Sequence, residues 1–398
     1  MISEAMRRLG DSPSAIRELF EYGRKRKEEI GAENVYDFSL GNPSIPAPES
    51  VGDTIVSLVK EKEPCALHGY TSAAGDLAVR QKIASFLSET HSFPVEREMI
   101  YMTCGAAASL TVSLHAIAEK GDEAIVLSPY FPEYRVFCEK AGMKVVEVPC
   151  REKDFQPDLP AIEKAITPRT KAILINSPNN PTGAVYSEES WRSLSDFLYD
   201  FRKKTGRMVF LLCDEPYREL NWTGKTAPFP PALYDAVILC YSFSKSLSLP
   251  GERIGYILVG SNCPEKKAVF AAVCGAGRSL GFVCAPALFQ YAVAENLGKT
   301  GDLSAYRENR EILCRALKEA GFEYAPPDGA FYLFLKAPDG DEKTFCARAK
   351  EEELLLVPST SFGCPGYARA SYCVSKETVL RSIPAFQKLA RFYQGERK

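Results

Sequence analysis

The segment from residue 241 to residue 255 places a single lysine, Lys245, among hydroxyl groups and directly after an apolar run. A lysine amine that its surroundings keep neutral is a nucleophile and can form a Schiff base with a carbonyl compound. Ser242 and Ser244 can donate hydrogen bonds to an anion, and Arg253 adds a permanent positive charge. Together these groups could bind a phosphorylated aldehyde such as pyridoxal phosphate. A solvated lysine in a serine-rich turn explains this segment alone equally well, so the rest of the chain must decide.

Short apolar runs in the middle of the chain predict the scaffold that positions this lysine. We expect buried strands at 124–127, 171–176, 208–213 and 237–240, because their apolar character is nearly continuous, as in parallel strands covered on both faces. Between the second and third runs, residues 188–204 repeat their apolar side chains with the 3.6-residue period of a helix. This alternation predicts an α/β fold with a mostly parallel central sheet covered by helices.

Polar and aromatic residues follow each of these four predicted strands. They lie at 128–134, 177–183, 214–217 and 242–245. In open α/β sheets, ligands bind beyond the carboxyl ends of the strands. We therefore expect the four segments to meet at one edge of the sheet and to form the active site.

The C-terminal hundred residues have a different pattern. An amphipathic helix is expected at 303–320, and strands at 330–336, 354–357 and 367–374, which predicts a smaller α+β unit. A charged helix at 14–30 is expected to pack on this unit or on another subunit. We predict a large domain at 46–290 and a small domain made of 1–45 and 291–398, since 398 residues exceed the usual size of one domain.

Composition excludes several classes of protein. The formal net charge is −2, which offers no basic surface for nucleic acid. The most apolar stretch, 268–294, is interrupted by Arg278 and Pro286 and is a poor membrane span, and the N-terminus lacks a secretory pattern. The 13 cysteines contain no Cys-x-x-Cys pair and are expected to be buried free thiols of a protein in the reducing cytoplasm. The three histidines lack metal-ligand spacing, so no metal site is expected.

The order of the motifs along the chain is more specific than any one of them. They are Gly-Asn-Pro at 41–43, Tyr70, Gly-Ala at 105–106, Pro-Tyr-Phe-Pro at 129–132, Asn-Pro-Thr-Gly at 180–183, Asp-Glu-Pro-Tyr at 214–217, Ser-Phe-Ser-Lys at 242–245 and Arg253. From about residue 39 to residue 375 this order resembles the class I/II (fold type I) aminotransferases that depend on pyridoxal 5'-phosphate, and the aspartate aminotransferases among them.

The resemblance implies a role for each residue around the cofactor ring. Lys245 would form the Schiff base and then move the proton between substrate and cofactor. Asp214 would pair with the protonated pyridine nitrogen, which keeps the ring able to absorb negative charge. Tyr217 and Asn180 would hydrogen-bond the ring hydroxyl oxygen, and Phe131 would stack on the ring.

The resemblance also implies how the phosphate is held. A glycine before a helix lets backbone N–H groups approach an anion, and the helix dipole favours the negative charge. In the family, a tyrosine from the neighbouring subunit reaches the phosphate as well, which implies a homodimer with shared active sites. The residues matched to the phosphate are Gly105, Ala106, Ala107, Ser242, Ser244, Arg253 and, from the other subunit, Tyr70.

Substrate recognition follows from the same resemblance. Arg369, on an otherwise apolar strand, would grip the α-carboxylate at two points. Gly41 and Asn42 would lie on the loop that closes over the substrate. Arg278 lies one residue off the spacing of an arginine with which some relatives bind a distal carboxylate across the subunit interface. A salt bridge at the dimer interface or the surface explains Arg278 equally well.

These observations leave more than one activity open. The leading hypothesis is an aminotransferase that uses aspartate or glutamate in a ping-pong reaction with a 2-oxo acid. The alternatives are an aminotransferase for alanine or aromatic amino acids and a C–S β-lyase, which would share the same lysine, aspartate, tyrosine and arginine. A regulatory protein that only binds the cofactor is disfavoured, because no basic DNA-binding segment is left over.

Overall fold

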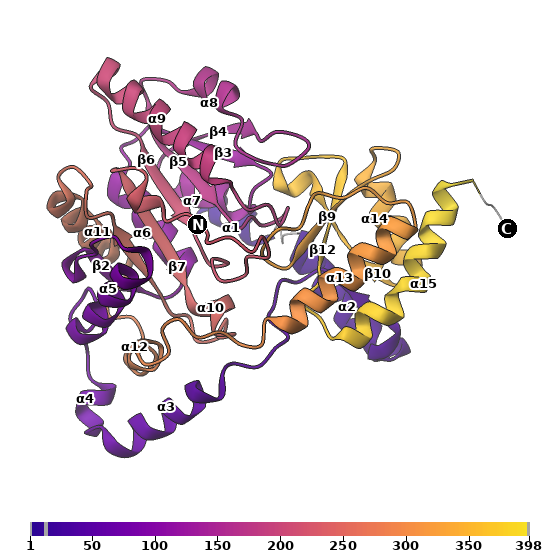
Figure 1. Cartoon of the computed structure of the whole chain (residues 1–398), viewed down its shortest axis with the longest axis horizontal. Helices are drawn as coiled ribbons and strands as arrows, with labels where there is room; N and C mark the ends of the chain where they lie inside the picture. Colours follow the sequence, from indigo (N-terminus) through magenta and orange to yellow (C-terminus); the bar gives the residue numbers. More distant parts are fainter. Residues whose placement is uncertain (1, 12–14, 396–398) are drawn as a thin grey trace.

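A seven-stranded sheet forms the centre of the larger part of the computed structural model, which describes residues 2–11 and 15–395 (Figure 1). Neighbouring strands from β7 to β4 run parallel, whereas β8 runs antiparallel to both β7 and β2. The prediction of a mostly parallel sheet is therefore confirmed. In spatial order the strands are β2 (Ile100–Thr103), β8 (Gly255–Val259), β7 (Val237–Ser242), β6 (Phe210–Asp214), β5 (Thr170–Asn176), β3 (Glu123–Ser128) and β4 (Lys144–Pro149).

The register of the central strands brings their carboxyl ends to the same level. Asn176 at the end of β5 pairs with Asp214 at the end of β6, and Asp214 pairs with Cys240 near the end of β7. All four predicted strands are present, with ends that differ from the prediction by one or two residues. The polar segments that follow them consequently meet at one edge of the sheet, as the sequence predicts.

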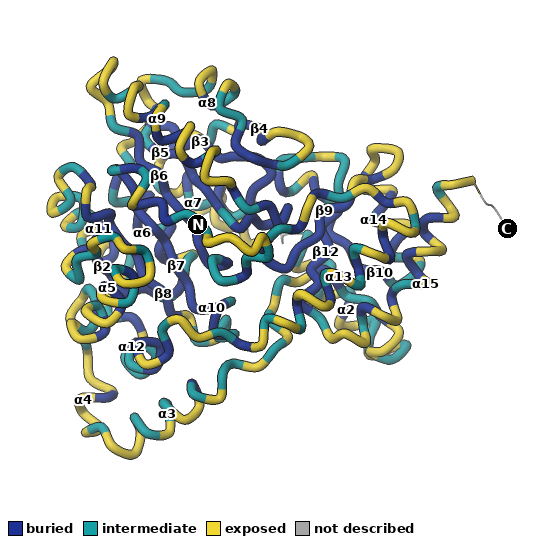
Figure 2. The backbone as a smooth tube through the Cα atoms, viewed as in Figure 1, coloured by how far each residue is buried: buried dark blue, intermediate teal, exposed yellow. Residues whose placement is uncertain are grey.

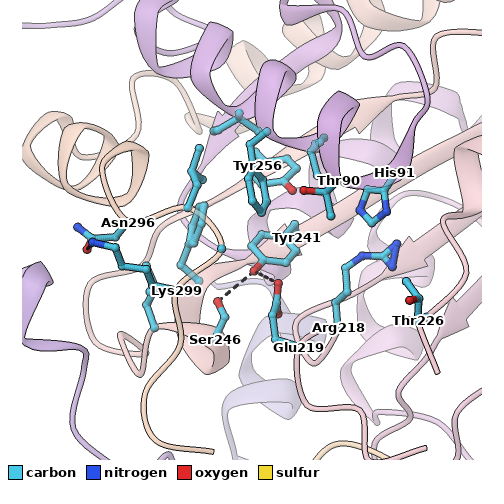
Figure 3. A pocket seen from close by; sticks show the side chains of 18 residues that line it. Thr90, His91, Arg218, Glu219, Thr226, Tyr241, Ser246, Tyr256, Asn296 and Lys299 are labelled. Carbon is cyan, nitrogen blue, oxygen red and sulfur yellow. Dashed lines mark hydrogen bonds between the residues drawn. The ribbon is translucent and has the colours of Figure 1, made fainter. Parts of the chain in front are cut away.

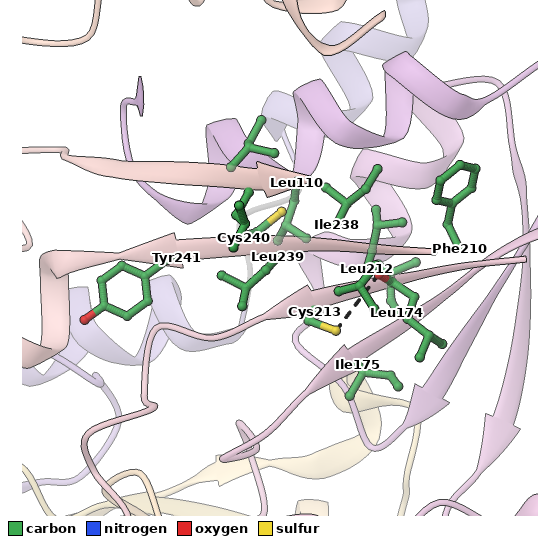
Figure 4. Close-up of a cluster of buried hydrophobic side chains, with 14 of the residues drawn as sticks. Leu110, Leu174, Ile175, Phe210, Leu212, Cys213, Ile238, Leu239, Cys240 and Tyr241 are labelled. Carbon is green, nitrogen blue, oxygen red and sulfur yellow. Dashed lines mark hydrogen bonds between the residues drawn. The ribbon is translucent and has the colours of Figure 1, made fainter. Parts of the chain in front are cut away.

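Helices cover the seven-stranded sheet. The larger of the two hydrophobic cores lies between this sheet and the helices. The tube in Figure 2 is dark blue along the central strands, whose residues are almost all buried. Figure 4 shows part of this core, where Leu174, Leu212 and Ile238 come from three neighbouring strands and Leu110 from a covering helix. Apolar side chains are buried on both faces of the strands, so this core stabilises the scaffold that carries the site.

The α-helices begin and end at residues whose chemistry explains their limits. In α9, the Ser187 side chain accepts a hydrogen bond from the Ser190 backbone, and Gly206 ends the helix in the left-handed conformation with φ 70°. The helices are α1 (Glu4–Asp11), α2 (Ala15–Ile30), α3 (Glu49–Glu61), α4 (Pro64–His68), α5 (Leu77–His91), α6 (Ala106–Ile117), α7 (Glu133–Lys140), α8 (Leu159–Ala165), α9 (Glu188–Thr205), α10 (Phe243–Ser246), α11 (Lys266–Leu280), α12 (Ala287–Ala294), α13 (Ser304–Glu319), α14 (Glu342–Glu351) and α15 (Lys376–Tyr393). Among the described residues, no helix is both long and apolar enough to cross a membrane.

Two smaller sheets form the second unit, drawn at the right of Figure 1. The strands β9 (Tyr332–Lys336), β12 (Tyr367–Ser371) and β11 (Val357–Pro358) pair antiparallel, and β1 (Tyr36–Asp37) pairs parallel with β10 (Leu354–Leu355). The single strand predicted at 354–357 is thus two short strands in different sheets. Helices α13, α14 and α15 pack around them. The division into domains at 46–290 and the remainder stays a prediction.

The N-terminal helix α2 packs on this second unit. Arg26 forms an ion pair with Glu353 at 2.6 Å, and Lys27 forms one with Asp37 at 2.8 Å. This agrees with the first of the two positions expected for the helix at 14–30, although Ser14 lies outside the described residues. The opposite end of α2 places Ile16 near the edge of the large sheet where the strands end.

The cysteines follow the prediction only in part. All thirteen are free, and six of them, including Cys213 and Cys240, are buried. The expectation of burial is wrong for Cys284, which is half-buried because it lies in the loop between α11 and α12 with φ 53°. Cys65, at the start of α4, is exposed.

Tyr306 ties the chain segment before α3 to α13, and its loss should destabilise the protein. The fully buried Tyr306 hydroxyl accepts a hydrogen bond from the Ser44 backbone N–H at 2.9 Å. Tyr306→Phe leaves this donor without a partner, which costs about 1–3 kcal/mol. We expect a lower thermal unfolding midpoint by differential scanning fluorimetry. Tyr393→Phe is the matched control, since the buried Tyr393 hydroxyl has no partner among the described residues; an equal loss in both variants would contradict the prediction.

Candidate active site

A cavity of about 280 Å³ lies beyond the carboxyl ends of β5, β6 and β7, where Asn176, Asp214 and Ser242 end these strands. Its lining residues come from the seven-stranded sheet, from the three-stranded sheet of the second unit and from the N-terminal segment, although they are far apart in the sequence. Of the residues that the sequence singles out, the following line it: Gly41, Ala106, Ala107, Phe131, Asn180, Asp214, Tyr217, Ser242, Ser244, Lys245, Arg253 and Arg369.

Lys245 reaches this cavity from the one-turn helix α10, which directly follows β7. Its Nζ donates a hydrogen bond to the Gly41 carbonyl oxygen at 2.6 Å. Burial lowers the pKa of Lys245 to about 8, and the positive charges of Arg253 and Arg369 act in the same direction, whereas Cys373 opposes them. The amine can therefore lose its proton near neutral pH, as a nucleophile or base requires.

Asp214 is almost fully buried, with 7% of its surface exposed, and only one of its carboxylate oxygens is paired. The Tyr134 hydroxyl donates to Oδ2 at 2.5 Å, and the Asn176 side chain donates to the backbone carbonyl of Asp214 at 2.8 Å. Burial raises the pKa of Asp214 to about 7, and the hydrogen bond from Tyr134 opposes this shift. Oδ1 has no partner among the described residues, so a cationic group at this position would compensate the buried carboxylate.

Tyr217 and Tyr332 join the two units across the cavity. Their hydroxyl oxygens lie 2.7 Å apart, and the two rings meet edge to face. Tyr332 also leaves no room at Gly41, since a Cβ there would collide with its hydroxyl. The close packing of these three residues holds Tyr217 against the cavity and explains why the loop at residue 41 carries a glycine.

The start of α6 and the end of β7 form a cradle with the donors an anion needs. Gly105 precedes α6 with φ 87°, and a Cβ at this position would lie 2.8 Å from Nη2 of Arg253. Arg253 Nη1 donates to Ser244 Oγ at 3.3 Å, and Ser242 Oγ lies 2.8 Å from the same oxygen. Backbone N–H groups, hydroxyls and a guanidinium thus converge, which is the donor set that binds phosphate.

Arg369 is the largest charged side chain of the interior, with 2% of its surface exposed. Nη1 donates to Asn180 Oδ1 at 3.0 Å, and Nη2 donates to the Ser39 carbonyl at 2.5 Å. The guanidinium lies 4.8 Å from the centre of the Tyr332 ring. Nε has no partner among the described residues, so Arg369 is a buried cation that still has capacity to bind a carboxylate.

Four residues of the predicted set do not line the cavity of their own chain. One of them, Gly105, directly precedes Ala106, which does line it. Asn42 is exposed, Tyr70 is 97% exposed, and Arg278 is exposed in the last turn of α11. The family resemblance implies that Tyr70 reaches the cavity of a neighbouring subunit, whereas Arg278 fits such a role and a salt bridge equally well; both roles stay predictions.

Three residues that hold the site together are not among those that the sequence predicts for it: Tyr134, Asn176 and Tyr332. Asn176 carried a signal, because it is the polar last residue of an otherwise apolar predicted strand. Tyr134 lay inside a polar segment that was expected at the site, but nothing marked its hydroxyl as the partner of Asp214. Tyr332 gave no signal, since an aromatic residue in an apolar strand is usually part of the core.

Comparison with known proteins identifies the family. Residues 33–386 match the family described as aminotransferase class I and II. The chain is 31% identical to an aspartate aminotransferase of Thermotoga maritima over 385 residues, which cover 95% of this chain and 97% of that protein. The chain therefore belongs to the class I and II aminotransferases. It is an enzyme of the aminotransferase type with the α/β fold of that family.

Solved structures agree with this assignment. The structure resembles an aminotransferase from Eubacterium rectale with a TM-score of 0.97 and 52% identity, covering 99% of both chains. It also resembles the aspartate aminotransferase of Thermus thermophilus solved with maleate, with a TM-score of 0.83 and 28% identity, covering 96% of this chain and 98% of that one.

The raised pKa of the buried Asp214 should make the stability of the cofactor-free protein depend on pH. Its pKa of about 7 in the folded chain lies above the value of about 3.9 in an unfolded chain, so the folded state holds the extra proton between these limits. Stability therefore falls as pH rises from about 4 to about 7, by at most about 1.4 kcal/mol per pH unit from this group. Asp214→Asn should flatten the pH dependence of the unfolding midpoint. The exposed Asp53→Asn is the control, and an unchanged slope in Asp214→Asn would refute the assignment.

Proposed function

We propose that the protein binds pyridoxal 5'-phosphate in this cavity and transfers an amino group between an L-α-amino acid, with aspartate or glutamate preferred, and a 2-oxo acid. The observation that carries the proposal is that three groups able to bind the cofactor and the substrate line one cavity. Lys245 offers an amine with a lowered pKa, Asp214 offers an unpaired carboxylate oxygen, and Arg369 offers an unpaired guanidinium N–H.

The residues present fit the cofactor. Asp214 Oδ1 would accept a hydrogen bond from the pyridine nitrogen, which would give this buried oxygen its missing partner. The phosphate would bind the cradle of Gly105, Ala106, Ala107, Ser242, Ser244 and Arg253. Asn180, Tyr217 and Phe131 would surround the ring.

Pyridoxal phosphate supplies an aldehyde that condenses with amines and a ring that takes up electron density when a bond at the substrate α-carbon breaks. The protein supplies the proton transfer and the orientation. Lys245 Nζ, neutral in a large fraction of molecules near pH 8, can take a proton and return it within the cavity. Arg369 would hold the substrate carboxylate in a planar two-point grip, which fixes the α-carbon relative to Lys245.

A homodimer completes the proposal. Helix α3 extends away from the rest of the chain in Figure 1, and its Val56 and Val59 are about half exposed. Tyr70 follows on the same arm. Exposed apolar side chains on such an arm favour burial against a second copy, whose cavity Tyr70 would reach. Free thiols favour a cytoplasmic location.

The preference for a dicarboxylate rests on Arg278 and on the relatives. The cations that line the described cavity are Lys245, Arg253 and Arg369, and each already has a proposed task. A distal carboxylate would therefore need a further cation, and Arg278 of a second copy is the candidate. The relatives from Thermotoga maritima and Thermus thermophilus are named aspartate aminotransferases, and the latter was solved with maleate, a dicarboxylate.

One observation favours an aromatic or large apolar donor instead. A hollow of about 290 Å³ adjoins the cavity and shares Ile16, Leu40 and Phe131 with it. Phe20 and Pro132 extend its apolar lining, and the charged residues Arg17 and Glu133 complete it. An apolar side chain could enter it without a second cation.

The absorption spectrum of the cofactor-loaded protein separates these possibilities. We expect L-aspartate alone, without a 2-oxo acid, to abolish the visible band of the bound cofactor and to release oxaloacetate. A response only to L-phenylalanine or L-alanine would overturn the preference for aspartate. Release of pyruvate and ammonia from a β-substituted amino acid, with no 2-oxo acid present, would instead select a β-lyase.

Arg278→Ala tests the distal-carboxylate role. Removing one partner of a buried charge pair costs at least about 2–3 kcal/mol, so kcat/KM for aspartate should fall about 100-fold. The kcat/KM for alanine should stay unchanged, because alanine has no distal carboxylate. Lys267→Ala, at an exposed position of the same helix, is the control. Equal losses for both amino acids in Arg278→Ala would remove this role.

Lys245→Ala tests the cofactor attachment. After treatment of the loaded wild type with borohydride, mass spectrometry should find the cofactor mass on the peptide that contains Lys245. The variant should carry no such adduct, and its transamination rate should fall by at least about 10³-fold, because both nucleophile and base are lost. The exposed Lys120→Ala should behave as the wild type, and an adduct on another lysine would refute the assignment.

A further inference from the structure

A second cavity, of about 260 Å³ and here called the rear cavity, is lined in part by residues next in sequence to those of the proposed active site (Figure 3). Its walls come from the C-terminal half of α5, from the end of β7 and the start of β8, from α10, and from the loops at 218–227 and 296–299. Its lining residues are Ile83, Phe86, Leu87, Thr90, His91, Arg218, Glu219, Thr226, Ala227, Tyr241, Phe243, Ser246, Leu247, Tyr256, Asn296, Leu297, Gly298 and Lys299.

The segment from residue 241 to residue 246 lies between the two cavities and lines both of them. Successive side chains of a strand point to opposite faces, so at the end of β7 Ser242 lines the active-site cavity, whereas Tyr241 lines the rear cavity. Helix α10 is divided as well, since Ser244 and Lys245 line the front cavity, and Phe243 and Ser246 line the rear one. An occupant of the rear cavity would therefore touch the other side of the turn that carries Lys245.

A second turn is divided in the same way. Tyr217 lines the front cavity, while Arg218 and Glu219, the next two residues, line the rear one. Figure 3 shows how one hydrogen-bonded group links both turns from behind: the Tyr241 hydroxyl donates to Glu219 Oε1 at 2.7 Å and lies 3.0 Å from Ser246 Oγ.

The size and lining of the rear cavity match a small aromatic molecule. Apolar side chains dominate its walls, among them Ile83, Leu87, Phe243 and Leu247. An apolar protein cavity of about 150 Å³ is known to hold benzene, so this volume accommodates a substituted ring. Most of the surface that these walls expose to the cavity is apolar, so burying an aromatic ring against it would be favourable.

Two buried polar atoms of the lining residues lack a hydrogen-bond partner: Arg218 Nε, which is still charge-paired with Glu215 at 3.3 Å, and Glu219 Oε2. Glu219 Oε2 is buried and accepts no hydrogen bond from the described residues, although Oε1 is paired with Tyr241. Burial raises the pKa of Glu219, and the hydrogen bond from Tyr241 opposes this shift. An unpaired buried acceptor is unfavourable by about 1–3 kcal/mol, so a donor on the occupant would be favoured at this position.

The basic side chains of the wall are already engaged, so they do not define an anion site. Both terminal nitrogens of Arg218 donate to the Pro228 carbonyl, and Nε lies 3.3 Å from Glu215. Lys299 Nζ donates to Asn296 at 3.1 Å. His91 stacks on a phenylalanine ring at 4.2 Å, and burial lowers its pKa to about 4, so it is neutral at physiological pH.

We propose that the rear cavity is a binding site for a small aromatic compound that carries a hydrogen-bond donor, and that its occupant acts on the active site through the turns of Tyr217 and Lys245. The ring would pack among the apolar walls, and the donor would pair with Glu219. The coupling would arise because both turns have one face in each cavity.

Binding is tested with phenol and toluene as probes on the cofactor-loaded full chain. Ligand-observed NMR should detect saturable binding of both, with phenol bound more tightly because only phenol can donate to Glu219. Glu219→Gln should reduce the preference for phenol. Equal affinity for the two probes in the wild type would overturn the role of Glu219, and the absence of saturable binding would overturn the site.

A matched pair of variants tests whether phenol binds in the rear cavity. Thr90→Trp adds an indole at the rim of the cavity and should weaken phenol binding by at least about tenfold, which corresponds to 1.4 kcal/mol. Ser85→Trp adds the same side chain at an exposed position of α5 outside the cavity and should bind phenol as the wild type does. Thermal midpoints close to that of the wild type would establish that both variants are folded. Unchanged binding in a folded Thr90→Trp would show that phenol binds elsewhere.

The coupling has its own readout. Phenol should shift the visible band of the bound cofactor in the wild type and in Ser85→Trp but not in Thr90→Trp. Binding by NMR without a spectral shift would overturn the coupling. These outcomes do not depend on which amino acid the enzyme uses, so they are independent of the proposed substrate preference.

Discussion

The structure depends on one buried guanidinium more than on any other group. Arg369 lies in the middle of the small antiparallel sheet, donates to Asn180 at the edge of the large sheet, and donates to the Ser39 carbonyl in the segment after β1. A single cation therefore holds three parts of the chain around one cavity. A buried charge without such partners would be strongly destabilising, so its location requires that the three parts stay assembled. The free Nε then gives the assembled site an unused donor for a substrate carboxylate.

The end of β7 is the second feature on which the arrangement of the site depends. The strand passes through the interior with both faces buried, and where it leaves the sheet its side chains divide between hydroxyls on one face and aromatic rings on the other. The hydroxyls serve an anion, and the rings form the wall of the rear cavity. Lys245 owes its lowered pKa to this position, because burial at the turn after β7 disfavours the charged amine and the nearby cations Arg253 and Arg369 act in the same direction.

Much of this arrangement could be predicted from the sequence, because its causes are local. The nearly continuous apolar character of 171–176 and 208–213 predicts buried parallel strands, and their shared direction places Asn176 and Asp214 at the same edge. The pairings of Tyr134 with Asp214 and of Tyr217 with Tyr332 could not be predicted, since they join residues 80 and 115 positions apart through tertiary packing. The division of 354–357 between two sheets has the same origin. No local pattern marks the point where a strand leaves one sheet for another.

The contact between Gly41 and Tyr332 has a consequence for how relatives of this enzyme can diverge. The tyrosine hydroxyl fills the space that any side chain at position 41 would need. As long as position 332 keeps a large ring, every replacement of the glycine must push the loop away from the Lys245 amine, which donates to its carbonyl. A smaller residue at 332 would remove this restriction at once. Across related sequences the two positions should therefore vary together, although they lie 291 positions apart along the chain.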